Sequence, residues 1–330
     1  VAQTMNVLNP AKIAIRDKAL KIVDAGMRSD EAIRLQYASK YARIANYWKK
    51  WIGENQGLKK SDAMGRKHKY EQDFMTRLKA DRAMHGKYGS LLDDFEKLYQ
   101  EIEPYALTRD YYNEIVRRNI EIMTVASYMN RLESLYANNG ATGYNGFKAR
   151  LEPFLDNFYK NYRPEIDQKV FASLMEMYVN ADILDGVKGD LAAMAKKHGG
   201  FDKYAKSLFE SSFVPNKNQM FKLLSADPKM AIESMQKDPL VQLAKQLSDA
   251  YDANISKEYN NLNTKINDLM RIYMEGQMKV FTEKKFFPDA NSTMRVSYGK
   301  VAGYSPRDAV TYNPVSYLDG AIEKYIPGDY

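Results

Sequence analysis

The chain has 330 residues, of which 45% are hydrophobic, and it carries a formal net charge of +7. It contains no cysteine, which excludes disulfides, thiolate metal sites and a cysteine nucleophile. No apolar run reaches the roughly 18–20 residues that a membrane-spanning helix needs, so we expect no membrane span. Acidic residues are interleaved with the basic ones, which favours a solvated surface, and we do not expect nucleic acid as a partner.

Amphipathic helices are predicted over most of the chain, residues 10–285. Pro10 opens the first helix. Ser29-Asp30-Glu31 is typical of a helix start, so a second helix is expected from there to Gly53 or Gly57. Long helices joined by short connections favour a bundle of long antiparallel helices.

The predicted second helix has two different sides. Its apolar side carries both tryptophans of the chain together with further aromatic and branched residues: Tyr37, Tyr41, Ile44, Trp48, Trp51 and Ile52. Asn46 lies on the opposite side, among the cations Arg43, Lys49 and Lys50. The apolar side indicates packing, whereas the side chain of Asn46 is available for binding.

More helices are expected toward the C-terminus. Thr108-Arg-Asp110 is typical of a helix cap and predicts a long helix that Asn138-Asn139-Gly140 ends. Asp238-Pro239 predicts the start of the longest helix, which continues to about Lys285. Further helices fit the segments 144–161, 165–182, 201–211 and 228–235. Methionines at helical spacing are expected to fill a core, namely Met270, Met274 and Met278.

The sequence offers no catalytic centre. The histidines, His68, His85 and His198, have no second ligand at metal-binding spacing, and no Gly-x-Ser-x-Gly or phosphate-binding glycine motif occurs. His198 is expected at the C-terminus of a helix, where a cation suits the helix dipole. We therefore assign no catalytic residue, no metal ligand and no cofactor.

The pattern changes at Pro288. Residues 293–301 alternate as a β-strand does, and residues 303–306 predict a turn. A single strand needs partner strands, and because the helical sequence offers few, the partners are expected outside the chain. The predicted fold class is mainly α, with a helical region over residues 1–287 and a short β segment within residues 288–330.

Two segments resemble the bacterial serine dipeptidyl peptidases of the dipeptidyl peptidase 7 and 11 family. One runs from Arg34 through Asn46-Tyr-Trp-Lys to Leu58, and the other covers Arg295–Asp308. The resemblance implies that the helical region is a cap inserted in a chymotrypsin-like peptidase domain, to which the C-terminal segment returns. The family's Gly-Asn-Ser-Gly-Ser and Thr-Asn-His runs have no counterpart here, so the chain would lack the Ser-His-Asp triad and be inactive alone.

The resemblance also implies one substrate-binding residue. The family has a helical-domain asparagine that holds the peptide main chain near its N-terminus; Asn46 matches it, with Asn55 as the second choice. The implied partners are a peptide N-terminus, a peptidase domain of the same protein and a second copy in a homodimer. The implied location is the periplasm or the cell surface.

Two other functions stay open on the residues alone. The chain could be a stand-alone helical binding or scaffold protein, which would need a self-contained C-terminal segment. It could also be a helical nucleic-acid-binding protein, a reading that depends only on the net charge and predicts binding that weakens steeply with salt.

Overall fold

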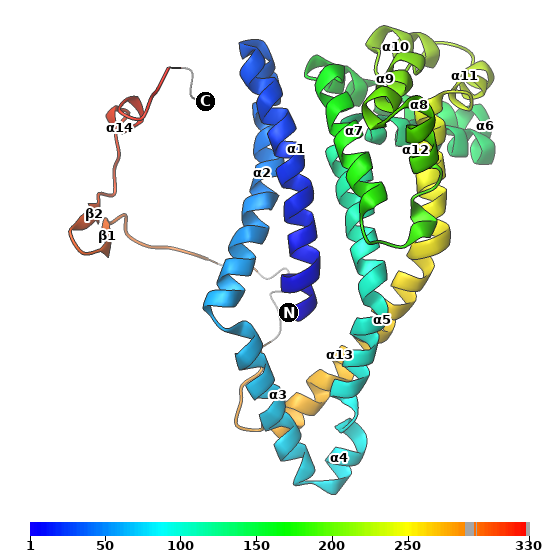
Figure 1. Ribbon diagram of the computed structural model, residues 1–330. Coiled ribbons are helices and arrows are strands. Elements are labelled where there is room, and N and C mark those ends of the chain that lie inside the picture. The colour runs from blue at the N-terminus through cyan, green and yellow to red at the C-terminus, as the bar shows by residue number, and fades with distance from the viewer. Residues whose placement is uncertain (288–293, 295, 328–330) are drawn as a thin grey trace. The chain divides into compact units, whose positions relative to one another are not determined.

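A computed structural model of the chain describes all residues except 288–293, 295 and 328–330. It divides into two compact units, Val1–Phe281 and Thr282–Tyr330. The first unit is built of helices, and β-strands in the described residues occur only in the second (Figure 1). The fold is therefore mainly α with a short β segment, as predicted. No helix in the described part of the chain has the length and apolar character that crossing a bilayer requires.

The first unit contains long helices, a series of shorter helices between residues 191 and 235, and π- or 3₁₀-helical segments (η) that join or extend helices. In chain order their bounds are η1 (Thr4–Leu8), α1 (Asn9–Ser29), α2 (Glu31–Lys60), α3 (Ala63–Lys79), α4 (Arg82–Tyr88), α5 (Leu91–Tyr112), η2 (Asn113–Asn119), α6 (Glu121–Lys160), α7 (Pro164–Asn180), η3 (Asp185–Val187), α8 (Leu191–His198), α9 (Phe201–Ser211), α10 (Lys217–Leu224), α11 (Pro228–Met235), α12 (Pro239–Tyr251), η4 (Asp252–Ser256) and α13 (Lys257–Val280).

Helices α1 and α2 lie side by side as an antiparallel pair (Figure 1). Asp30 joins them in an extended conformation, and its carboxylate accepts a hydrogen bond from the backbone N–H of Ile33 at 3.0 Å. This side-chain cap satisfies one of the free N–H groups at the start of α2. The predicted start of the second helix is thus confirmed, but the helix continues past Gly57 to Lys60.

The predicted cap at Thr108 is wrong. Thr108 is buried inside α5, where its hydroxyl donates to a backbone carbonyl one turn earlier at 2.7 Å. The chain leaves helical geometry at Ile120 instead. The N–H groups of Glu121 and Ile122 then donate to the carboxylate of Asp167, each at 2.8 Å. Because Asp167 belongs to α7, the cap that starts α6 comes from a distant part of the sequence.

Helix α6 bends at Gly140, where the break was predicted. Gly140 has φ 58° and ψ −153°, a conformation that essentially only glycine adopts. The second half of α6 folds back toward the first, so that the ring of Tyr128 contacts Phe147 and Phe154, at centroid distances of 6.1 and 5.3 Å. The helix continues beyond the break, which is where the predicted segment 144–161 lies.

Several other predicted helices are confirmed. The segments 201–211 and 228–235 coincide with α9 and α11, and α7 lies within a residue or two of the predicted segment 165–182. Asp238 caps α12, because its carboxylate accepts hydrogen bonds from the first N–H groups of that helix at 3.0 and 3.1 Å. The helical path from Pro239 passes through η4 and ends at Val280. His198 is the last residue of α8, as expected.

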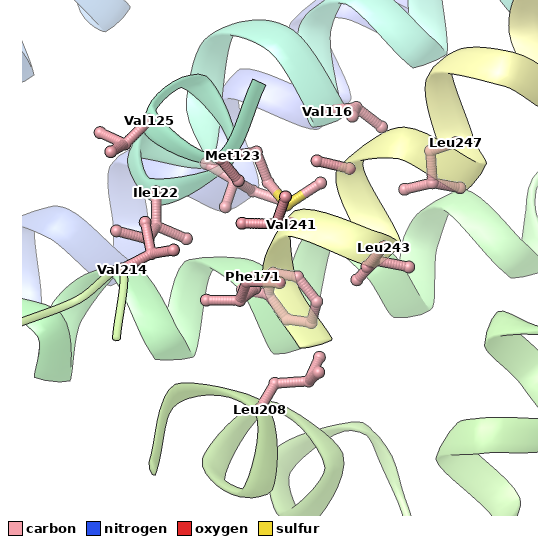
Figure 2. Packing of buried hydrophobic residues seen from close by; sticks show 14 of the residues in the cluster. Val116, Ile122, Met123, Val125, Phe171, Leu208, Val214, Val241, Leu243 and Leu247 are labelled. Carbon is pink, nitrogen blue, oxygen red and sulfur yellow. The ribbon is translucent and has the colours of Figure 1, made fainter. Parts of the chain in front are cut away.

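The main hydrophobic core lies where η2, α6, α7, α9 and α12 meet. Figure 2 shows residues of these elements and of the connection after α9 packed together, and most of them are aliphatic: Val116, Ile122, Met123, Val125, Phe171, Leu208, Val214, Val241, Leu243 and Leu247. All of them are buried. The core therefore fixes the break between η2 and α6, which borders the candidate site described below.

A second group of buried rings joins α3, α5 and α13. The ring of Tyr273 contacts Phe74 and Phe95 edge-on, at centroid distances of 5.3 and 5.8 Å. Aromatic pairs favour this arrangement because of their quadrupoles. The predicted core methionines of α13 are exposed instead: Met270 by 46%, Met274 by 38% and Met278 by 55%. Tyr273 and the other buried residues of α13 occupy a different side of that helix.

The second unit holds the hairpin of β1 (Tyr304–Arg307) and β2 (Val310–Tyr312), followed by α14 (Asp319–Ile322). The strands pair antiparallel, and the rings of Tyr304 and Tyr312 stack at 5.3 Å. The predicted turn at 303–306 is therefore wrong, since these residues run into β1. The chain turns after Arg307 instead, at Ala309, where φ is 58°.

The strand predicted over residues 293–301 does not form in its described part. Met294 and residues 296–301 are exposed and have no strand partner among the described residues. Thr293 and Arg295 lie outside the described residues. Alternation alone does not make a strand, because the backbone groups need a partner. The two strands that do form, β1 and β2, lie later in the sequence and pair with each other.

Candidate functional site

The apolar side of α2 is used for packing, as predicted, and α1 lies against this helix. Tyr37 and Trp51 are buried, and Trp48 is half-buried. Two cations of α1 cover the Trp51 ring: the Lys12 ammonium lies 4.8 Å from the ring centroid and the Arg16 guanidinium 5.0 Å. Such contacts are attractive because the ring face is negative. These contacts on one side of α2 therefore hold its opposite side in a fixed position.

Arg16 connects three segments. It is only 3% exposed, its Nε donates to the Glu114 carboxylate of η2 at 2.7 Å, and a terminal nitrogen donates to the Ile44 carbonyl of α2 at 3.2 Å. Its guanidinium also lies 4.9 Å from the ring centroid of Tyr47. A buried charge needs such partners, because removal from water is costly.

Asn46 is exposed on the far side of α2 from these contacts. Its neighbours Arg43, Lys49 and Lys50 are exposed as well. No residue in the described part of the chain forms a hydrogen bond with the Asn46 amide. Its oxygen can accept hydrogen bonds and its nitrogen can donate them, so both groups are available to a ligand.

Asn55, the second choice, is used differently. Its Nδ2 donates to the Met5 carbonyl at 3.1 Å, and its Oδ1 accepts a hydrogen bond from Nδ2 of Asn9 at 3.0 Å. Asn9 is fully buried. Both groups of the Asn55 amide therefore tie α2 to η1 and α1, and a structural role accounts for this side chain.

A cavity of about 580 Å³ borders the Asn46 side of α2. Its walls come from α2, from the junction of η2 with α6 and from the second half of α6, and Arg16 contributes from α1. Cations and aromatic rings dominate these walls: Arg16, Lys40, Arg43, Tyr47, Arg117, Arg118, Tyr128, Phe154 and Phe158. Asn46 is three residues from Arg43 on the same helix, so it lies at the margin of the cavity.

A polar cluster that is partly buried supports one wall of this cavity. The Lys40 ammonium pairs with Glu121 at 2.6 Å and lies 4.1 Å from the ring centroid of Tyr37. The Tyr162 hydroxyl donates to Asp167 at 3.1 Å. Burial raises the pKa of Asp167 to about 7, and the nearby Glu121 carboxylate acts in the same direction. The two N–H groups at the start of α6 oppose this rise.

A second cavity, of about 830 Å³, adjoins the first and lies between α6 and α12. The two share Arg117, Thr124 and Tyr128 in their walls. The ion pair of Lys245 with Asp249, at 2.9 Å, belongs to the second cavity. No group of histidine and carboxylate residues in the described ranges could hold a metal ion.

The cations at the junction of η2 and α6 were not predicted as site residues. Arg117 and Arg118 precede the break at Ile120, and the sequence gives no local sign of that break because its cap is Asp167. The only sequence feature that could have indicated a cationic site here is the pair of adjacent arginines itself. Their proximity to Arg43 follows only from the packing of α1, α2 and η2.

The whole chain, residues 1–330, matches the Peptidase S46 family. It is 45% identical over 330 residues to the Asp/Glu-specific dipeptidyl-peptidase of Flavobacterium psychrophilum, covering 100% of this chain and 45% of the relative. It is 31% identical over 323 residues to dipeptidyl-peptidase 7 of Porphyromonas gingivalis, covering 97% of this chain and 44% of the relative. The chain thus spans about half the length of these curated relatives.

The fold also matches solved structures. The crystal structure of Porphyromonas endodontalis DPP11 in complex with the dipeptide Arg-Glu superposes with a TM-score of 0.74 at 21% identity, over 99% of this chain and 46% of that chain. On the match of its full length, the chain belongs to the peptidase S46 family.

Proposed function

We propose that this chain is the helical, substrate-gating part of a serine exopeptidase that removes dipeptides from the N-termini of peptides. Membership of the peptidase S46 family supports this, as do relatives named as dipeptidyl peptidases that match the chain along nearly all of its length. The nucleophile and its base belong to further sequence of the same protein, since the chain contains neither family motif. The 330-residue chain is then inactive alone.

One observation carries the proposal to a particular residue: the exposed Asn46 amide has no partner among the described residues and sits on a helix held by buried contacts on its other side. An enzyme that counts two residues from the N-terminus must recognise the free ammonium group. The amide oxygen can accept from that ammonium while the amide nitrogen donates to a peptide carbonyl. Binding there would position the scissile carbonyl at the nucleophile.

The complete gene product and the 330-residue chain give the experiment for this proposal. Each is incubated with a hexapeptide that has a free N-terminus, and the products are identified by mass spectrometry. We expect the complete protein to release dipeptides in succession and the chain to release nothing. Cleavage by the chain, or release of single residues or internal fragments by the complete protein, would contradict the proposal. A stand-alone scaffold protein predicts no cleavage by either.

We further propose that the complete protein works as a homodimer in the periplasm or at the cell surface. The resemblance to dipeptidyl peptidases 7 and 11 motivates both statements, and the absence of cysteine is compatible with an oxidising compartment. Cell fractionation tests the location, and sedimentation of the complete protein tests the dimer. Cytosolic protein or a monomer would contradict the respective statement.

A further inference from the structure

The cavity beside Asn46 is strongly cationic. Five cationic side chains line it: Arg16, Lys40, Arg43, Arg117 and Arg118. Two carboxylates lie close enough to pair with them, Glu121 in the wall and Glu114 behind it. These five cations and two carboxylates leave a net charge of +3 around a cavity of about 580 Å³. A concentration of one charge sign in a hollow attracts ligands of the opposite sign.

The cations divide into paired and unpaired groups. Glu114 pairs with Arg16 at 2.7 Å and with Arg118 at 3.3 Å, and Lys40 pairs with Glu121 at 2.6 Å. Arg43 and Arg117 form no ion pair with any residue that the structure describes, and both are exposed. They come from different walls, α2 and η2. Two guanidinium groups thus line one cavity without a counter-charge, and guanidinium binds carboxylates with two parallel hydrogen bonds.

The aromatic lining favours a peptide over a simple inorganic anion. Tyr47 is 44% exposed and Phe154 is 40% exposed, although both are large apolar residues. A phosphate or chloride ion would pair with the arginines but would leave these rings in water. A peptide can place a carboxylate on the arginines and lay its apolar parts on the rings, which removes apolar surface from water.

The cavity also lies next to Asn46, the residue that the proposed function assigns to the substrate. Ser39, Arg43, Asn46 and Lys50 recur at helical intervals and form one exposed line along α2. Ser39 and Arg43 line the cavity. A peptide held at Asn46 therefore has Arg43 within one helical turn.

We propose that this cavity is a binding site for the side-chain carboxylates of acidic peptides, with Arg43 and Arg117 as the ligands of the carboxylate. The site belongs to the helical unit itself and does not need the free N-terminus. That its ligand is a peptide depends on the proposed function. The recognition of the carboxylate depends only on the charges and geometry of the cavity.

Calorimetric titration of the full 330-residue chain tests this site. The ligand is a short peptide with acetylated and amidated ends that contains tyrosine and two aspartates, and the matched ligand replaces both aspartates by asparagines. We expect the aspartate peptide to bind at least about tenfold more tightly, with an affinity that falls as salt rises. Arg43→Gln combined with Arg117→Gln should remove this preference.

The control variant, Lys59→Gln with Lys60→Gln, removes the same charge from exposed positions farther along α2 and should keep the preference. Equal affinity for the two peptides, or a preference unaffected by the Arg43 and Arg117 changes, would overturn the proposal. So would inorganic phosphate that binds the chain as tightly as the aspartate peptide and displaces it, since that marks a general anion site. Because the blocked peptides have no ammonium group, these results are independent of Asn46 and of peptide cleavage.

Discussion

Arg16 shows how one buried charge can hold a helical surface in place. Its guanidinium joins α1 to Glu114 in η2 and to the Ile44 carbonyl in α2, and it lies against two aromatic rings. Apolar side chains in place of both Arg16 and Glu114 would leave no charge buried. Removing Glu114 alone leaves the buried charge of Arg16 without compensation. Through these two contacts, Arg16 fixes the position of α2 relative to η2. It therefore also fixes the position of Arg43 in α2 relative to Arg117 in η2.

Glu114→Gln should lower the free energy of unfolding by about 3–5 kcal/mol, because it leaves the Arg16 guanidinium buried without a counter-charge. Urea denaturation of the chain measures this. The matched control is Asp17→Asn, which breaks the exposed pair of Asp17 with Lys21, and should cost less than about 1 kcal/mol. Similar small losses in both variants would show that the buried pair does not hold the three segments together.

Asp167 predicts a pH dependence of stability. Since burial raises its pKa in the folded state to about 7, from an ordinary value of 3.8, the folded state favours the protonated carboxyl. Its contribution to stability is present at low pH and is lost as the pH rises through about 7. The unfolding free energy of the wild type minus that of Asp167→Asn should therefore fall between about pH 4 and pH 7 and stay level above that.

Asp30→Asn serves as the control, because Asp30 caps α2 at an exposed position and asparagine also caps helices. The unfolding free energy of the wild type minus that of Asp30→Asn should show no comparable fall over that pH range. If the Asp167 difference grows with pH, the hydrogen bonds from Glu121, Ile122 and Tyr162 outweigh burial, and Asp167 is held in its charged form.

Single residues also mark where sequence reasoning ends. The side of α2 on which Asn46 lies follows from helical periodicity, and its exposure agrees with that position. The hydrogen bonds of Asn55 to Met5 and Asn9 could not be predicted, because they depend on how η1 and α1 pack against α2. Periodicity places a side chain on a helix, whereas its partners depend on the neighbouring helices.

At the scale of elements, the helix starts that were predicted have local caps, whereas the start that was missed has a cap from a distant helix. The starts at Asp30 and Asp238 were predictable because each carboxylate caps N–H groups within a few residues of itself. The break at Ile120 was not, because Asp167 supplies its cap from α7. The hairpin of β1 and β2 was missed because the alternation of residues 293–301 suggested a strand nearby without indicating which residues pair.

The bend at Gly140 gives a prediction at this scale. Gly140→Ala should lower the free energy of unfolding by about 1–3 kcal/mol, since alanine rarely adopts a φ of 58° with a ψ of −153°. Gly146→Ala is the matched control in the same helix: open space surrounds the added methyl group, and the helical backbone should gain up to about 1 kcal/mol. Thermal or urea denaturation compares them, and a neutral Gly140→Ala would mean that α6 does not need this bend.

On the scale of the whole molecule, we propose that the helical unit supplies a substrate-binding surface to the complete protein. One side of α2 is anchored by Trp51 and Arg16, and the other carries Asn46 beside a cationic cavity. Membership of the peptidase S46 family and the shared fold give this surface its context. The spacing of apolar residues and the helix caps predicted the helical class. They could not predict the cavity, because α1, α2, η2 and α6 all contribute to its walls.

Above all, we propose that this helical unit binds the N-terminus of a peptide through Asn46. The most direct test measures kcat/KM of the complete protein on one peptide with a free or an acetylated N-terminus, for the wild type and for Asn46→Ala. We predict a loss of roughly 10–100-fold for the free peptide in Asn46→Ala, the effect of one hydrogen bond to a charged group, and little cleavage of the acetylated peptide. Gln56→Ala, which removes another exposed amide of α2, should keep the wild-type rate. Equal rates for Asn46→Ala and the wild type, or equal cleavage of both peptides, would contradict the claim.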